Sequence, residues 1–127
     1  VGRLGGAAIG AHPCRPGRGL DESLLAQGLC GVVETRNGRT PEALNLQAED
    51  LAERYGLPAT GGSDAHDLEE LGLVRTRFLA PVRTRADLIA ALAAGLCRPF
   101  LPQDEPGLRR LTNCSVERFR RSVPPRH

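Results

Sequence analysis

Three side chains of the kinds that bind divalent metals stand directly after short apolar runs of this sequence. His12 follows AAIGA, and Asp64 and His66 follow LPATGG, within the segment GGSDAH. A neutral imidazole and a carboxylate are the usual nitrogen and oxygen ligands of zinc, manganese or iron. Residues i and i+2 of an extended chain face the same side, so Asp64 and His66 can address one centre. The pattern is compatible with a metal site formed by these three residues.

Each of the three residues also has a simpler interpretation. Asp64 can cap the turn that leads into DLEELG, and His66 can be a surface residue. His12 can be a core histidine bonded to a backbone carbonyl. Taken singly, each simpler role is more common than metal binding. Taken together, at equivalent places in successive units of the chain, the three residues favour the metal site.

The elements that must hold these residues alternate between strand and helix. Short apolar or β-branched runs predict strands at 7–11, 31–35, 57–62 and 74–81. Apolar stripes between these runs predict helices at 22–27, 41–55 and 85–95. This alternation predicts an α/β fold with parallel strands and right-handed helical crossovers. The carboxyl ends of such strands meet, which would bring together His12, Glu34, Asn37, Asp64 and His66.

Capping residues indicate where the predicted helices begin. Asp21 is placed to cap the first helix, and Thr40 is placed to cap the second, with Pro41 at its first position. Thr84 and Asp87 have the spacing of a capping box at the start of the third helix. In the second helix the apolar residues fall on one face, namely Leu44, Ala48, Leu51, Ala52 and Tyr55.

Composition and charge exclude several classes of protein. The chain has 127 residues, 40% hydrophobic and 25% charged, which is typical of one globular domain or part of one. No apolar run is long enough to cross a membrane or to form a signal peptide, so we expect a cytoplasmic protein with no membrane partner. The four cysteines include no C-x-x-C pair, which argues against a zinc ribbon.

Basic charge is concentrated at the C-terminus. Residues 1–103 carry 11 arginines and 12 acidic residues, whereas residues 104–127 carry 6 arginines and 3 acidic residues. We interpret 1–103 as the folded domain and 104–127 as a flexible, solvated tail. Nucleic-acid binding by this tail is the weaker alternative, because Phe119 is its single aromatic residue for base stacking.

Four segments together resemble the C-terminal half of a PHP domain, the polymerase and histidinol phosphatase family. They are AHPCRPG at 11–17, VVETRNGR at 32–39, LAERYGLPATGGSDAHDLEELG at 51–72 and RTRF at 75–78. The A-H-P, E-x-x-N-x-R and G-S-D-A-H motifs stand in the order that the family has. The resemblance covers about residues 5–97.

The resemblance implies the C-terminal portion of a distorted (β/α)7 barrel that holds zinc, manganese or iron at its mouth and hydrolyses phosphoesters. It implies that His12, Asp64 and His66 are metal ligands and catalytic residues. Glu34 is expected to support a ligand from behind or to line the substrate pocket. The predicted contacts to a phosphorylated small molecule or nucleotide come from Asn37, Arg15 and Arg39, although simple surface charge is an alternative for both arginines.

One departure from the family limits this prediction. The His-x-His motif and the further acidic and histidine ligands that precede A-H-P in PHP domains are absent from the chain. Three explanations follow: a fragment of a longer protein, a half-barrel completed by another chain or by self-association, or a non-catalytic remnant. We favour the fragment. The main functional hypothesis is a metal-dependent phosphoesterase, and the alternative is a metal-binding or partner-binding PHP remnant without turnover.

Overall fold

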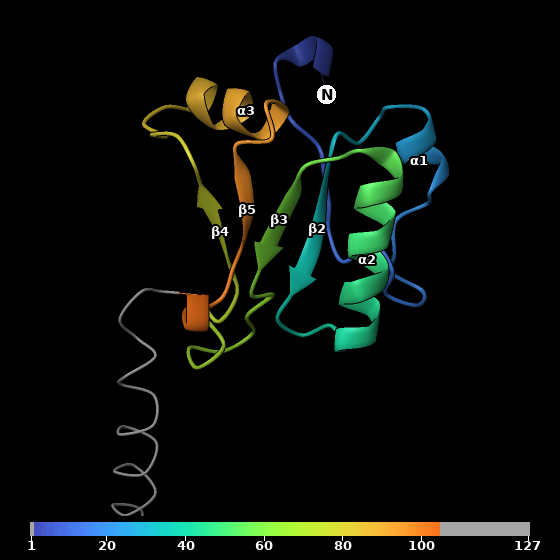
Figure 1. The fold of residues 1–127 in the computed structure, drawn as a ribbon, viewed down its shortest axis with the longest axis vertical. Coiled ribbons are helices and arrows are strands. Elements are labelled where there is room, and N and C mark those ends of the chain that lie inside the picture. Colours follow the sequence, from blue (N-terminus) through green and yellow to red (C-terminus); the bar gives the residue numbers. More distant parts are fainter. Residues whose placement is uncertain (1, 105–127) are drawn as a thin grey trace, which may run out of the picture.

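A computed structural model describes residues 2–104 of the chain (Figure 1). The elements, in chain order, are η1 (Gly2–Leu4), β1 (Ile9–Gly10), α1 (Ser23–Ala26), β2 (Val32–Asn37), α2 (Glu42–Tyr55), β3 (Ala59–Gly62), β4 (Arg75–Phe78), α3 (Arg85–Ala93), β5 (Cys97–Phe100) and η2 (Pro102–Asp104). The predicted tail, with Phe119 and Cys114, lies almost entirely outside the described residues.

Three parallel strands form the sheet that carries the candidate site. Their order is β1-β2-β3, with Ile9 opposite Val32 and Val33 opposite Ala59. Strands β2 and β3 end at the same edge, and α2 lies along one face of the sheet (Figure 1). This part confirms the predicted parallel alternation of strand and helix, with β1 shorter than its apolar run suggested.

The fourth predicted strand is present but does not extend the parallel sheet. Strand β4 pairs with β5 in an antiparallel ladder, with Phe78 opposite Cys97. The prediction of a parallel fourth strand was therefore wrong, and strand β5 was missed. Its sequence CRPF is only four residues long, and Pro99 lacks an amide donor, so it has little local strand signal.

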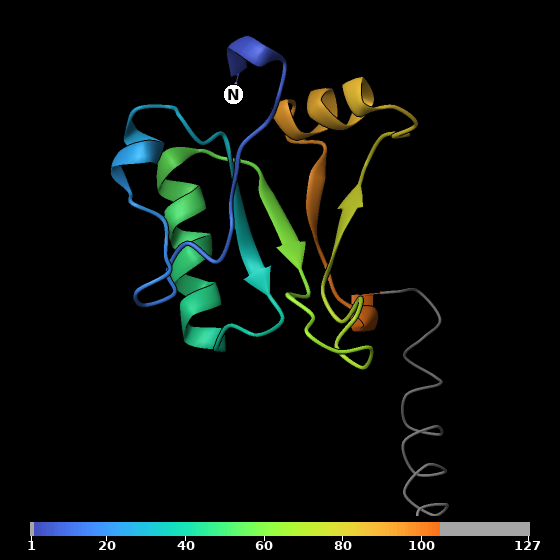
Figure 2. The same cartoon turned by 180° about the vertical axis from the view of Figure 1, so that it is seen from behind.

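The two sheets meet without closing a barrel in the described part of the chain. The Thr76 hydroxyl donates to the Gly61 carbonyl at 2.7 Å and accepts from the Gly61 amide at 3.1 Å, which ties β4 to β3. Seen from behind, β4 and β5 stand next to β3, away from α2 (Figure 2). The α/β class is confirmed, whereas a closed barrel is not formed by residues 2–104.

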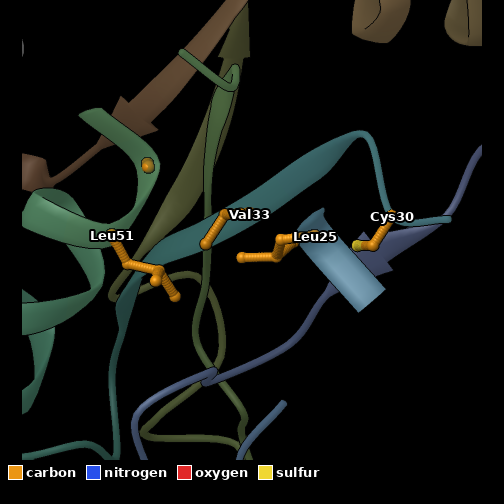
Figure 3. Close-up of a cluster of buried hydrophobic side chains, with 5 residues drawn as sticks. Leu25, Cys30, Val33 and Leu51 are labelled. Atoms are coloured by element: carbon orange, nitrogen blue, oxygen red, sulfur yellow. The ribbon is translucent and has the colours of Figure 1, made fainter. Parts of the chain in front are cut away.

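A compact apolar cluster fixes α1 and α2 against the parallel sheet. Its buried members are Leu25, Cys30, Val33, Leu51 and Ala52. Val33 is completely buried at the centre of this cluster, with Leu25 and Leu51 on either side (Figure 3). Burial of each such aliphatic side chain contributes about 1.5–3 kcal/mol before entropy is counted. The position of strand β2, and hence of its terminal residues, is set by this packing.

Helix α2 begins differently from the sequence prediction. Pro41 is its N-cap, and the amides of Leu44 and Asn45 bond to the Pro41 carbonyl. Thr40, predicted as the cap, instead donates its hydroxyl to Asn37 Oδ1 at 3.1 Å. The Thr40 hydroxyl is therefore engaged at the end of β2 and does not cap the first turn of α2. Gly56, in the left-handed conformation at φ 60°, ends the helix directly after residue 55, where the predicted range 41–55 also ends.

One of the other two helix signals agrees with the structure. The Thr84 and Asp87 capping box is present at the start of α3, with the Asp87 amide 3.1 Å from Thr84 Oγ1. At α1 the N-cap is Glu22 and not the predicted Asp21, which accepts from the Ser23 amide at 2.9 Å from just before the helix. Within residues 2–104, no helix combines the length and the apolar character that a membrane span requires.

Candidate functional site

A pocket of about 360 Å³ opens where the loops after β1, β2 and β3 meet. It is lined by His12, Arg15, Arg18, Arg39, Asp64 and His66. Five of these six residues were singled out from the sequence, three as metal ligands and two as substrate contacts. The convergence of strand ends therefore places the candidate residues around one space.

His12 occupies the turn immediately after β1 in a strained conformation. Its φ is 32°, a value that non-glycine residues rarely adopt. Its amide donates to Glu34 Oε2 at 2.7 Å. The ring atom Nδ1 is buried and has no hydrogen-bond partner among the described residues. A buried polar atom without a partner costs free energy, so this nitrogen is suited to a ligand that the described residues do not include.

Glu34 supports the loop from below and does not line the pocket. Its Oε2 atom accepts from the His12 amide and from Asn37 Nδ2, the latter at 3.0 Å. A Cβ atom at Gly62 would overlap Glu34 Oε1, so this carboxylate would have to move if residue 62 carried a side chain. The predicted supporting role of Glu34 has a geometric basis here, through the backbone of His12 and not through its imidazole.

Asn37 lies beneath the pocket at the end of β2. It is only 3% exposed, and its Oδ1 accepts from Arg15 Nη2, from the Arg39 amide and from the Thr40 hydroxyl. Its backbone amide donates to Asn45 Oδ1 at 3.1 Å. The side chain of Asn37 therefore connects the end of β2 with the loop after β1, through Arg15, and with the loop after β2, through Arg39 and Thr40.

Asp64 is held by an arginine from the loop after β1. Its Oδ2 atom lies 2.8 Å from Arg15 Nη2, and its backbone has a φ of 52°. The hydrogen bond from Arg15 is the main reason that the pKa of Asp64 is lowered, partly opposed by desolvation. The carboxylate therefore stays ionised at neutral pH and carries a negative charge into a pocket that is otherwise basic.

The hydrogen bond of the His66 ring selects one tautomer of the neutral imidazole. Its Nδ1 lies 2.8 Å from the carbonyl oxygen of Asp64, and its amide donates to Glu70 Oε2 at 2.8 Å. A carbonyl only accepts, so Nδ1 carries the proton and Nε2 keeps its lone pair in the neutral ring. Metal-binding histidines are commonly oriented by this kind of bond to a carbonyl.

These donors fit part of a metal site. Two imidazoles and an ionised carboxylate are suitable ligand types, and both rings have a nitrogen available for coordination. Within residues 2–104, however, no group of three or more His, Cys, Asp or Glu side chains is arranged to hold a metal ion. Completing a coordination sphere at this pocket needs a shift of these side chains or further donors.

Arg18 is the pocket residue that the sequence analysis did not single out. It stands in the turn after Arg15, where its amide bonds to the Arg15 carbonyl at 3.2 Å. Its guanidinium has no ion pair or side-chain hydrogen bond with any residue that the structure describes. Among 17 basic residues, all of them arginine, no motif distinguished it.

The comparisons with known proteins point to one family. Residues 42–97 match the PHP-associated family PHP_C. No curated protein matches the chain significantly. Among solved structures, the chain is similar to PsfC from Pseudomonas syringae PB-5123, with 25% sequence identity and a TM-score of 0.60. The match covers 87% of this chain and 45% of PsfC, so the chain spans less than half of that structure's length. Residues 42–97 of this chain are therefore similar to the PHP-associated family, and this range includes the G-S-D-A-H motif of the sequence resemblance.

Proposed function

We propose that this chain supplies part of a metal-dependent phosphoesterase site of the PHP type. The observation that carries the proposal is the composition of one pocket, in which His12, Asp64 and His66 lie with three arginines. Imidazole and carboxylate groups bind divalent zinc, manganese or iron, whereas guanidinium groups bind phosphate. A phosphorylated small molecule or a nucleotide is the class of substrate that needs both.

The residues of the chain have distinct tasks in this proposal. His12 would bind the metal through Nδ1, and His66 would bind it through Nε2. Asp64 would bind it through its carboxylate. When bound, the metal would supply the Lewis acidity that phosphoester hydrolysis requires. Asp64 is suited to the task because its lowered pKa keeps it ionised. Glu34 and Asn37 hold the loop after β1 against the end of β2, so that the ligands keep their places.

Two arginines are suited to bind the phosphate. Arg18 has no competing ion pair with the described residues, and Arg39 is paired loosely with Glu70, with 3.6 Å between Nη1 and Oε2. Two guanidinium groups that line one small pocket favour an anion that carries more than one negative charge. The phosphoryl group of a monoester meets this requirement.

The remaining metal ligands would come from outside the described residues. The chain spans 45% of the PsfC structure, and a second segment or a second copy could provide them. We also propose a cytoplasmic location, as expected from the sequence. The alternative function is a metal-binding or partner-binding PHP remnant without turnover.

The direct test is hydrolysis of p-nitrophenyl phosphate by the protein expressed from its complete reading frame, with Mn²⁺ or Zn²⁺ added. Asp64→Ala should lower kcat/KM by more than about tenfold, because a candidate ligand is lost. Asp67→Ala is the matched control, since this exposed carboxylate lies outside the pocket. Equal activity of Asp64→Ala and the parent protein would exclude the proposal. Bound metal without any turnover would support the remnant.

A further inference from the structure

Arg15 connects the ends of all three parallel strands through one nitrogen atom. From the loop after β1, its Nη2 reaches Asn37 Oδ1 at 3.0 Å and Thr40 Oγ1 at 2.8 Å, which lie at and just beyond the end of β2. The same atom reaches Asp64 Oδ2, beyond the end of β3, at 2.8 Å. These contacts link residues 22 to 49 positions apart in the chain.

The first two acceptors hold the guanidinium before Asp64 is considered. Asn37 is 3% exposed and Thr40 is 9% exposed, and the two are themselves hydrogen-bonded at 3.1 Å. They are therefore rigid neighbours of Nη2. Because this nitrogen carries two hydrogens and meets three acceptors, at least one hydrogen is shared. Asn37 and Thr40, which do not line the pocket, thus fix the position from which Arg15 Nη2 donates to Asp64.

Asp64 needs such support because its backbone is in a left-handed conformation. A φ of 52° is tolerated by aspartate but costs free energy relative to the extended or helical regions. The residues on both sides of Asp64 are half-buried, and the following His66 is exposed. The backbone before Asp64 is held by the Gly38 amide, which donates to the Gly62 carbonyl at 2.9 Å, and the Asp64 carboxylate itself is held by the ion pair with Arg15.

We propose that Arg15 is a positioning residue for Asp64 and does not bind the phosphoester. This inference rests on the proposed function and deepens it. It reassigns Arg15 from the substrate contact that the sequence suggested to a group that acts through Asp64. The charge that meets the anion then comes from Arg18 and Arg39.

The first experiment needs no metal and no substrate. Amide hydrogen exchange is measured in the parent protein, in Arg15→Met, which keeps an unbranched aliphatic stem but has no donor, and in Arg18→Met, the matched control. Residues 62–66 should exchange about tenfold faster in Arg15→Met, with strand β2 near Val33 unchanged. Arg18→Met should leave residues 62–66 unchanged, because Arg18 has no side-chain partner among residues 2–104. Unchanged exchange at 62–66 in Arg15→Met would overturn the proposal.

The second experiment separates positioning from anion binding. Calorimetric titration with Mn²⁺ should show binding weakened about tenfold in Arg15→Met and partly restored in Arg15→Lys, whose ammonium offers three donors to three acceptors. Titration with inorganic phosphate should give the reverse pattern. Phosphate binding should be weakened in Arg18→Met, whereas its Kd in Arg15→Met should stay within about twofold of the parent value.

Two results of these titrations would contradict the assignment. Loss of phosphate binding in Arg15→Met would make Arg15 a substrate contact. Tighter Mn²⁺ binding in Arg15→Met would make Arg15 a competitor of the metal for Asp64. If the parent protein bound no Mn²⁺ at all, the proposed function would fail, and the exchange experiment would still decide whether Arg15 positions Asp64.

Discussion

Replacing Asn37 by alanine should lower the free energy of unfolding by more than the replacement of an exposed polar residue does. The change removes the donor to Glu34 Oε2 and the acceptor of three hydrogen bonds, from Arg15, Thr40 and the Arg39 amide. It leaves the Thr40 hydroxyl buried without this partner, and it frees Arg15 and Glu34 from one contact each. The site is 3% exposed, so water cannot easily replace what is lost.

The magnitude follows from the number and burial of these bonds. Each hydrogen bond contributes about 1 kcal/mol net, and a buried group left without a partner costs about 1–3 kcal/mol. The four contacts share partners and are not additive, so we expect a loss of about 2–4 kcal/mol in the free energy of unfolding. For a domain of this size, that corresponds to a fall of roughly 10 °C in Tm.

Urea unfolding followed by circular dichroism measures this change directly. Gln47→Ala, on the exposed side of α2, is the control and should change stability by less than about 0.5 kcal/mol. The isosteric Asn37→Asp should also be destabilised, because it sets a second carboxylate beside Glu34. If Asn37→Ala lowered the free energy of unfolding by less than about 1 kcal/mol, the view that the Asn37 side chain stabilises the loops beneath the pocket would be refuted.

Two further predictions concern acid stability and the junction of the two sheets. Arg15 lowers the pKa of Asp64 in the folded state, so their contribution to stability is present above the ordinary pKa of aspartate, about 3.9, and is lost as the pH falls below it. Acid unfolding should show this loss in the parent protein and not in Arg15→Met; identical pH profiles would contradict it. Gly61→Ala should cost about 1–3 kcal/mol in urea unfolding, because its Cβ would lie 2.7 Å from the Arg75 carbonyl oxygen and 3.3 Å from Pro99 Cα. Gly31→Ala, with no atom within 4 Å of its Cβ among the described residues, should change little, and equal costs for the two would exclude a tight β3 junction.

Local signals predicted most of the parallel sheet and its helices. The β-branched run at Val32–Val33, the left-handed Gly56 and the Thr84 capping box depend on neighbours within a few residues, so their sequence patterns are informative. The antiparallel pairing of β4 with β5 depends on residues 97–100, whose sequence has little strand character. For this reason the parallel direction was predicted correctly for the first three strands only.

The candidate site, too, could be predicted from the sequence only in part. His12, Asp64 and His66 follow predicted strands, and parallel strands end at one edge of a sheet, so a common pocket could be predicted from the sequence. The partners of each arginine depend on the tertiary structure: Arg15 is engaged with Asn37, Thr40 and Asp64, whereas Arg18 has no such contacts among the described residues. Hydrogen bonds between residues 22 to 49 positions apart leave no periodic or local trace in the sequence, because they depend on how the loops pack after the strands have paired.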